Sequence, residues 1–123
     1  MQSLTVVLFQ GDARVAQSLA SALSQGFSSV EQVQSLDELR NRIAKHRAQV
    51  AILDIEAAPL FEIAHLSQDF SGVCIVCTHR VADEAMWAAA LQVGAADVYP
   101  SHDITGIVRA ALGNAVKPRS AAA

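Results

Sequence analysis

The chain has 123 residues, a net charge of −3 at pH 7, and 52% apolar against 17% charged residues. This length suits a single domain with a sizeable buried core. The charge balance argues against a protein that binds nucleic acid, which would show a basic face. No apolar run approaches the roughly 20 residues of a membrane span, and the first three residues lack the basic start of a secretory signal. We therefore expect a cytoplasmic protein, and its two cysteines fit a reducing compartment.

Apolar runs and helical patterns alternate along the chain. Strands are predicted where the sequence is β-rich or continuously apolar, at residues 4–9, 30–33, 50–53, 73–77 and 97–99. Helices are predicted where apolar side chains recur every three or four residues, over 12–23, 36–47, 60–64, 83–93 and 104–112. The basic end of the second helix, residues 42–47, suits the helix macrodipole, and we interpret it as a solvated face.

Five βα units in a row predict an α/β fold, a three-layer sandwich. Right-handed crossovers place helices on both faces of a five-stranded parallel sheet. The continuous apolar runs at 50–53 and 73–77 are typical of strands that are buried on both faces. Residues 1–116 form the one predicted domain, and residues 117–123 are predicted to be a disordered tail.

Polar side chains follow several strands at the point where each strand ends. Asp12 comes after the first strand, Asp54 after the third, Thr78 after the fourth and Ser101 after the fifth. Open parallel sheets bind ligands at the carboxyl ends of their strands, so we expect these residues to meet in one pocket. Asp54 stands out, because a buried strand that ends in a carboxylate is typical of an acid placed for chemistry.

The strand-end Asp54 and Thr78, together with the stretch Gly94–Asp97, resemble the receiver domain of bacterial response regulators. The resemblance covers about residues 4–115 and implies a flavodoxin-like strand order, 2-1-3-4-5. It also implies that Asp54 accepts a phosphoryl group from a histidine kinase and that Thr78 hydrogen-bonds this group. Such transfer is mostly positioning and charge neutralisation by a metal and a cation.

The pocket departs from the family pattern at its charged positions. The acidic pair that holds Mg²⁺ in the family falls on Gln10 and Gly11, and the family's lysine falls on Ser101. We therefore predict weak or absent phosphorylation by small phosphodonors. Asp54 has a second interpretation, level with the first, as a retained acid that hydrogen-bonds loop amides.

A residual magnesium site would use Asp12, Asp54 and the backbone carbonyl of Glu56. Mg²⁺ prefers a near-octahedral set of oxygen ligands, and these residues make a poor set. We expect Mg²⁺ binding to be weak or absent. Asp12 has a competing role, because it stands where a helix N-cap is expected.

The resemblance also implies a surface for partners, formed by the fourth helix, the fifth strand and the fifth helix. On this surface we predict Trp87, Val98 and Tyr99 as interface residues. Val98 stands where the family carries its switch aromatic, and Tyr99 is adjacent. The expected partner is a histidine kinase or another signalling protein, and a homodimer through this surface is an alternative.

Three functions remain open from the sequence. The chain is a phosphorylated receiver of a two-component phosphorelay, a pseudo-receiver that binds its partner constitutively, or a flavodoxin-like enzyme or ligand binder. The sequence contains no G-x-G-x-x-G motif, no P-loop and no G-x-S-x-G elbow. We therefore expect a signalling module and not an enzyme. Cys74 and Cys77 form a C-x-x-C spacing, but residues three apart on a strand point to opposite faces, so we predict two core residues.

Overall fold

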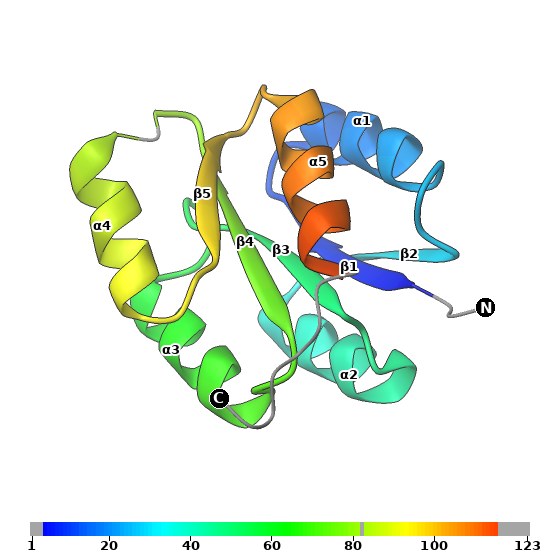
Figure 1. Cartoon of the computed structure of the whole chain (residues 1–123), viewed down its shortest axis with the longest axis horizontal. Helices are drawn as coiled ribbons and strands as arrows, with labels where there is room; N and C mark the ends of the chain where they lie inside the picture. The colour runs from blue at the N-terminus through cyan, green and yellow to red at the C-terminus, as the bar shows by residue number, and fades with distance from the viewer. Residues whose placement is uncertain (1–3, 82, 116–123) are drawn as a thin grey trace.

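The computed structural model describes residues 4–81 and 83–115, in which strands and helices alternate strictly (Figure 1). The predicted elements are all present, although the third and fifth helices are longer than their sequence patterns. The predicted tail lies outside the described residues. In chain order the elements are β1 (Thr5–Phe9), α1 (Ala13–Leu23), β2 (Ser29–Val33), α2 (Leu36–His46), β3 (Val50–Asp54), α3 (Leu60–Asp69), β4 (Cys74–His79), α4 (Glu84–Gln92), β5 (Asp97–Pro100) and α5 (Ile104–Ala115).

The strands form one parallel sheet in the order β2-β1-β3-β4-β5, as predicted. The direction of the strand order reverses between β1 and β3, which is where open α/β sheets form their ligand crevice. The register pairs Asp54 with Thr78 on the neighbouring strands β3 and β4. The sheet therefore brings these two predicted site residues side by side.

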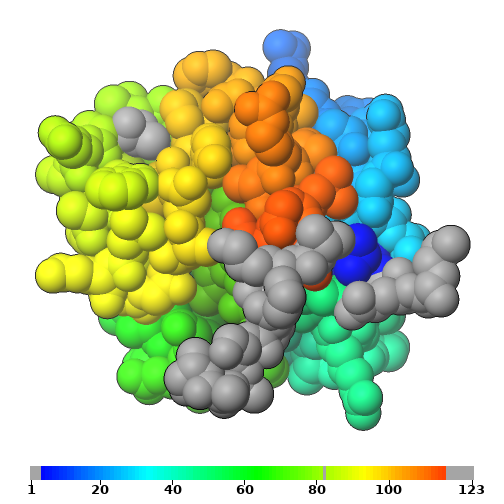
Figure 2. All heavy atoms as spheres, in the orientation of Figure 1, coloured from blue at the N-terminus to red at the C-terminus, as the bar shows by residue number. Residues whose placement is uncertain are grey.

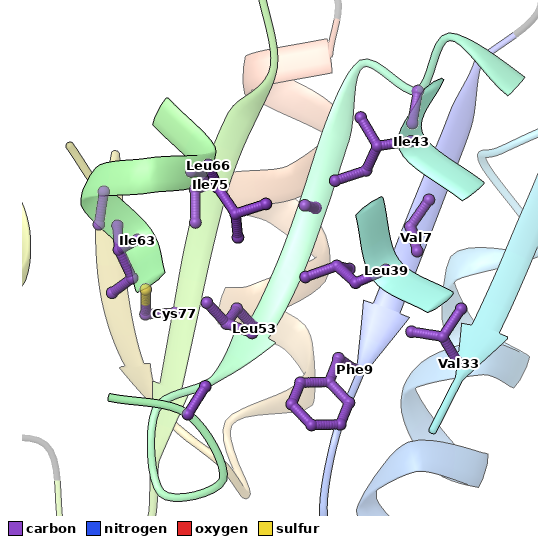
Figure 3. Close-up of a cluster of buried hydrophobic side chains, with 14 of the residues drawn as sticks. Val7, Phe9, Val33, Leu39, Ile43, Leu53, Ile63, Leu66, Ile75 and Cys77 are labelled. Atoms are coloured by element: carbon purple, nitrogen blue, oxygen red, sulfur yellow. The ribbon is translucent and has the colours of Figure 1, made fainter. Parts of the chain in front are cut away.

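Helices cover both faces of the sheet, and alternate strand residues form two separate cores. Val7, Leu53 and Ile75 point toward α2, α3 and α4, where Figure 3 shows them beside Leu39 and Ile63. The opposite face is covered by α1 and α5 (Figure 1). Its core consists mainly of Val6, Leu8, Leu19, Leu23, Val50, Ile52, Val76 and Ile107. Burial on both faces explains why the central strands are apolar at successive positions.

Local sequence signals fix the ends of several helices. Ser35 caps α2 by accepting a hydrogen bond from the Glu38 amide at 3.1 Å, as the capping-box pattern predicts. Gly94 ends α4 with a positive φ of 117°, and a Cβ atom there would lie 2.5 Å from Ser67 Oγ. Glycine is therefore required both by the backbone conformation and by the lack of space.

Within the described residues, no helix combines the length and the apolar character that crossing a membrane requires.

Candidate functional site

An open cleft of about 540 Å³ lies where the strands β1, β3, β4 and β5 end. It is lined by Gln10, Gly11, Asp12, Val15, Asp54, Glu56, Ala57, Arg80, Ser101 and His102. The structure thus brings together Asp12, Asp54 and Glu56, which the sequence proposed as one site. Thr78 lies beneath them, fully buried, and is linked to the lining through Gln10.

Asp54 is buried and both of its carboxylate oxygens accept hydrogen bonds from the main chain. Asp54 is the last residue of β3 and is only 3% exposed. Oδ2 accepts a hydrogen bond from the Gly11 amide at 2.9 Å, and Oδ1 accepts one from the Glu56 amide at 2.9 Å. The carboxylate therefore ties the β1–α1 loop to the β3–α3 loop, as the loop-amide interpretation of this acid requires.

Gly11 allows the β1–α1 loop to approach Asp54 this closely. A Cβ atom at position 11 would lie 3.0 Å from Asp54 Oδ2, which is closer than ordinary van der Waals contact. Any side chain at this position would have to displace the carboxylate or the loop. The position that the resemblance assigns to the second acid is thus occupied by a residue without a side chain, and a larger residue would require a shift of a few tenths of an ångström.

Gln10 connects β1 to β4 through its side-chain amide. Its Nε2 donates a hydrogen bond to Thr78 Oγ1 at 3.0 Å, and its Oε1 accepts one from the Asp12 amide at 3.1 Å. The Thr78 hydroxyl, which the resemblance assigns to the phosphoryl group, is therefore bonded to a neutral amide. The resemblance places a carboxylate at position 10, whereas the Gln10 amide contributes no charge to the cleft.

Asp12 caps helix α1. Its Oδ1 accepts hydrogen bonds from the amides of Arg14 at 2.9 Å and Val15 at 3.3 Å. These amides belong to the first turn of α1, where no intrahelical partner is available to them. The capping role of Asp12 is thus present in the structure.

Arg80 and Glu56 form an ion pair at the mouth of the cleft. Arg80 Nε lies 2.8 Å from Glu56 Oε1, and the Arg80 amide donates a hydrogen bond to Glu56 Oε2 at 3.0 Å. The hydrogen bond from the Arg80 side chain is the main reason that the pKa of Glu56 lies below its usual value. The same bond, with the charges of Glu56, Asp54 and Asp12, raises the pKa of Arg80.

Sequence reasoning missed Arg80, although a signal for it was present. Arg80 follows Thr78 by two residues, just as Glu56 follows Asp54 by two residues. Because Asp54 and Thr78 are paired across β3 and β4, residues at equal distances beyond them emerge side by side. A search for charged residues shortly after each strand end would have placed Arg80 in the cleft.

Ser101 stands at the family's lysine position and is only 5% exposed. Its amide donates a hydrogen bond to the His79 carbonyl at 3.0 Å, which extends the contact between the ends of β4 and β5. Its Oγ is buried and has no hydrogen-bond partner among the described residues. This position therefore supplies a small neutral side chain and no cation.

The oxygen atoms of the cleft do not fit a Mg²⁺ site as they are arranged. Both oxygens of Asp54 accept main-chain hydrogen bonds, the Asp12 carboxylate caps a helix, and the Glu56 carboxylate pairs with Arg80. Residues 4–81 and 83–115 contain no group of three or more His, Cys, Asp or Glu side chains arranged to hold a metal ion. Mg²⁺ prefers carboxylate oxygens that it can share with water in octahedral geometry, so a metal ion here would compete with these hydrogen bonds and with the ion pair.

The two cysteines lie in the core and take no part in the cleft. Cys74 belongs to the core under α1 and α5, and Cys77 to the core under α2, α3 and α4. Their opposite directions confirm the alternation predicted for the strand. Burial raises the pKa of the Cys77 thiol to about 12, with a smaller contribution from Cys74. Cys77 is therefore a neutral packing residue at physiological pH.

The predicted interface residues occupy different environments around α4 and β5. Trp87 on α4 is 45% exposed, and its Nε1 donates a hydrogen bond to Asp97 Oδ1 at 2.9 Å. Tyr99 is half-buried, and burial followed by the nearby Asp97 raises its pKa. Val98 is only 7% exposed and packs in the core beside Ala90 and Ala95, so its side chain adds little to this surface. Figure 2 shows α4, β5 and α5 side by side on one face, in yellow-green to orange.

Solved structures with the same fold are receiver domains and response regulators. The signal receiver domain of a two-component response regulator from Bacteroides fragilis matches with a TM-score of 0.85 and 18% identity, over 95% of this chain and 100% of that one. An orphan response regulator of H. pylori, HP1043, matches with a TM-score of 0.78 and 15% identity, over 91% and 96%. An atypical orphan response regulator, described as having a phosphorylation-independent regulatory mechanism, matches with a TM-score of 0.79 and 14% identity, over 90% and 94%.

No family model matches the sequence, and no curated protein sequence matches it either. The similarity to the solved structures therefore rests on the three-dimensional fold. The chain has the flavodoxin-like fold of response regulator receiver domains, with the strand order and helix layers that the sequence predicted.

Proposed function

We propose that the chain is a receiver-type signalling module of the cytoplasm that acts through protein contact and is not switched by phosphorylation. The observation that carries this proposal is the state of Asp54, whose two carboxylate oxygens accept hydrogen bonds from the Gly11 and Glu56 amides. In a phosphoacceptor, one of these oxygens must attack phosphorus. Here each oxygen has already accepted one main-chain hydrogen bond, which weakens it as a nucleophile and fixes the carboxylate between two loops.

The charges of the cleft support the same proposal. An acyl phosphate adds about two negative charges at pH 7, and these need a metal ion or fixed cations for stabilisation. Position 101 supplies a buried serine, and position 10 supplies a neutral amide that donates a hydrogen bond to the Thr78 hydroxyl. Glu56 and Asp12 add negative charge to the cleft lining. The product of phosphorylation would therefore be poorly stabilised.

A structural neighbour supports the feasibility of this kind of module. The atypical orphan response regulator with a TM-score of 0.79 is described as having a phosphorylation-independent regulatory mechanism. The present chain shares this fold at 14% identity, so the neighbour is a precedent for regulation without phosphorylation within the same fold. For the present chain, the proposal depends on the residues of its own cleft.

For the partner surface we propose the face formed by α4, β5 and α5, with Trp87 and Tyr99 at its centre. Trp87 is exposed and its indole is held by Asp97, so little side-chain freedom would be lost when a partner binds. Tryptophan is also the residue type most enriched among strong contacts in protein interfaces. A histidine kinase, another signalling protein or a second copy of the chain would bind here.

A phosphorylated receiver is the second candidate, and one observation favours it. Arg80 places a positive charge at the mouth of the cleft, where it acts on Asp54 and Asp12. If Arg80 exchanged Glu56 for a phosphoryl group, it would supply part of the charge that the family's lysine provides. Under this alternative Asp54 is the acceptor and Thr78 bonds the phosphoryl group.

The deciding experiment is intact mass spectrometry after incubation with Mg²⁺ and acetyl phosphate or phosphoramidate. An Asp54→Ala variant and an active receiver of another protein serve as controls under the same conditions. We expect no gain in mass in either the wild type or the variant, while the active receiver gains a phosphoryl group. A gain of one phosphoryl group that disappears in Asp54→Ala would overturn the proposal in favour of the second candidate.

Beryllofluoride provides an independent check, because it mimics the phosphoryl group without a transfer reaction. We expect the amide NMR signals of Gly11, Glu56 and Arg80 to stay in place when beryllofluoride and Mg²⁺ are added. Saturable shifts at these three amides would show that the cleft still accepts a phosphoryl-like group and would argue for the second candidate.

A further inference from the structure

We propose that Arg80 is a built-in counter-ion of the cleft, which takes the place that a divalent metal ion would otherwise occupy among its carboxylates. This role of Arg80 concerns the response of the cleft to metal ions and does not depend on the proposed function.

The bonds between Arg80 and Glu56 join two loops at the sheet edge. Arg80 uses both its side chain and its main chain, so that Nε meets Oε1 at 2.8 Å and the amide meets Oε2 at 3.0 Å. Both oxygens of Glu56 are thereby engaged by one residue. A metal ion bound in such a cleft would link the same loops through carboxylate oxygens, whereas here the link consists of protein hydrogen bonds.

The place of the pair follows from the sheet. Asp54 and Thr78 are partners in the last rung between β3 and β4, and the Ile55 amide continues the contact by donating to the Thr78 carbonyl at 3.0 Å. Glu56 and Arg80 each lie two residues beyond the Asp54–Thr78 rung. The ion pair therefore links the two loops that follow β3 and β4, just beyond Asp54 and Thr78.

The lining has an excess of negative charge that Arg80 reduces. Its described residues include the carboxylates of Asp12, Asp54 and Glu56, but Arg80 is its only arginine or lysine. The charge of Arg80 acts on all three acids, as the increase in its own pKa indicates. Like charges that share a cleft disfavour one another, so a nearby cation stabilises the set, and because the Arg80 side chain is 80% exposed, water screens part of its charge. A divalent cation would gain less by entering a cleft that already contains this charge.

The test is a Mg²⁺ titration of the full chain, followed by amide NMR, for the wild type and three variants. Arg80→Gln removes the charge, and Arg80→Lys keeps the charge but changes the hydrogen bonds. Arg40→Gln is the matched control, because Arg40 forms a comparable ion pair with Asp69 at 2.7 Å that lies outside the cleft lining. The spread of the amide signals and the fluorescence of the single tryptophan verify that each variant is folded.

We expect Arg80→Gln to gain saturable shifts at the amides of Gly11, Asp12 and Glu56. Its apparent Kd for Mg²⁺ should be at least about tenfold lower than in the wild type, Arg80→Lys or Arg40→Gln. The inference is overturned if Arg80→Gln responds no more strongly than Arg40→Gln, or if the wild type already binds Mg²⁺ as tightly as Arg80→Gln does.

This outcome is distinguishable from the outcome of the phosphorylation experiment. Phosphorylation of wild-type Asp54 would contradict the proposed function, but the counter-ion role of Arg80 would still be tested by the Mg²⁺ response of Arg80→Gln. An Arg80→Gln variant that does not respond to Mg²⁺ would contradict the counter-ion role, even if the wild type gave no phosphoryl adduct.

Discussion

At the scale of single residues, Gly11 shapes the cleft as much as Asp54 does. The carboxylate of Asp54 is held at 2.9 Å by the Gly11 amide, and this distance depends on the missing side chain. At position 10 the side-chain amide of Gln10 bonds the Thr78 hydroxyl, so a second strand end is linked through a neutral group.

Ser101 gives a prediction at this scale. Its buried Oγ has no hydrogen-bond partner among the described residues, so the hydroxyl is desolvated without compensation. We expect Ser101→Ala to leave the free energy of unfolding unchanged or to raise it by up to about 1 kcal/mol. Urea unfolding, followed by the fluorescence of Trp87, measures the difference.

Thr78→Val is the matched control, because Thr78 is equally buried but its hydroxyl accepts a hydrogen bond from Gln10. Removal of this hydroxyl leaves the Gln10 amide without its partner and should lower the free energy of unfolding by about 1–3 kcal/mol. A loss of more than about 1 kcal/mol in Ser101→Ala would show that its Oγ has a stabilising contact.

At the scale of secondary-structure elements, charged residues attach helix α2 to the edge strand β2. Arg42 Nη1 lies 2.5 Å from Glu31 Oε1, and His46 Nε2 lies 3.7 Å from the same oxygen. The sequence indicated a solvated basic face at the end of α2. The structure shows that two of its residues meet an acid on β2, which the helix pattern alone does not reveal.

The pH dependence of stability should reflect this contact. Burial tends to raise the pKa of Glu31, but the hydrogen bonds from Ser29 and Arg42 outweigh it, so the pKa lies below its ordinary value of 4.5. Because the folded pKa is lower than the unfolded one, the contribution is present above about pH 4.5 and is lost as the pH falls through the folded pKa. We expect Arg42→Gln to raise the pKa of Glu31 and to cost about 0.5–1 kcal/mol at pH 7.

The measurements are an NMR titration of the Glu31 carboxyl group and urea unfolding at pH 7, 5 and 3. The difference in stability between Arg42→Gln and the wild type should shrink toward pH 3. Arg40→Gln serves as the control, since its ion pair with Asp69 does not involve Glu31. A difference that stayed constant down to pH 3 would mean that the Arg42 side chain stabilises the protein by packing and not by charge.

At the scale of the whole molecule, the sheet is stabilised by two apolar cores, one on each face. Leu53 on β3 is fully buried, and its side chain packs toward α2 and α3 (Figure 3). Phe61 on α3 is 60% exposed. Large apolar residues of similar hydrophobicity thus contribute very differently to stability. The difference is decided by their positions in the layers and not by their chemistry.

Truncation of these two residues tests this view. We expect Leu53→Ala to lower the free energy of unfolding by about 2–5 kcal/mol, because it removes buried methyl groups and leaves a cavity. Phe61→Ala should change it by no more than about 0.5 kcal/mol. Both values come from urea unfolding monitored by Trp87 fluorescence, and comparable losses in the two variants would contradict the assignment of Leu53 to the core.

The layers, the element order and the position of Asp54 can all be predicted from the amino-acid sequence. Strand and helix periodicities reflect which side chains are buried, and such patterns are set by neighbours along the chain. The continuous apolar run that ends in Asp54 identifies a central strand and its terminal acid. Capping residues such as Asp12 and Ser35 were equally readable, because their partners lie within three residues.

Which polar side chains meet at the strand ends depends on the three-dimensional fold. The contacts of Gly11 with Asp54, Gln10 with Thr78 and Arg80 with Glu56 join residues that are 43, 68 and 24 positions apart. No local pattern encodes such distances, because they depend on the strand register and on the path of each loop beyond the sheet. The burial of Val98 likewise follows from the packing of α4 against the edge strand β5. The sequence does not reveal it, because a valine on an edge strand can face either the core or the solvent.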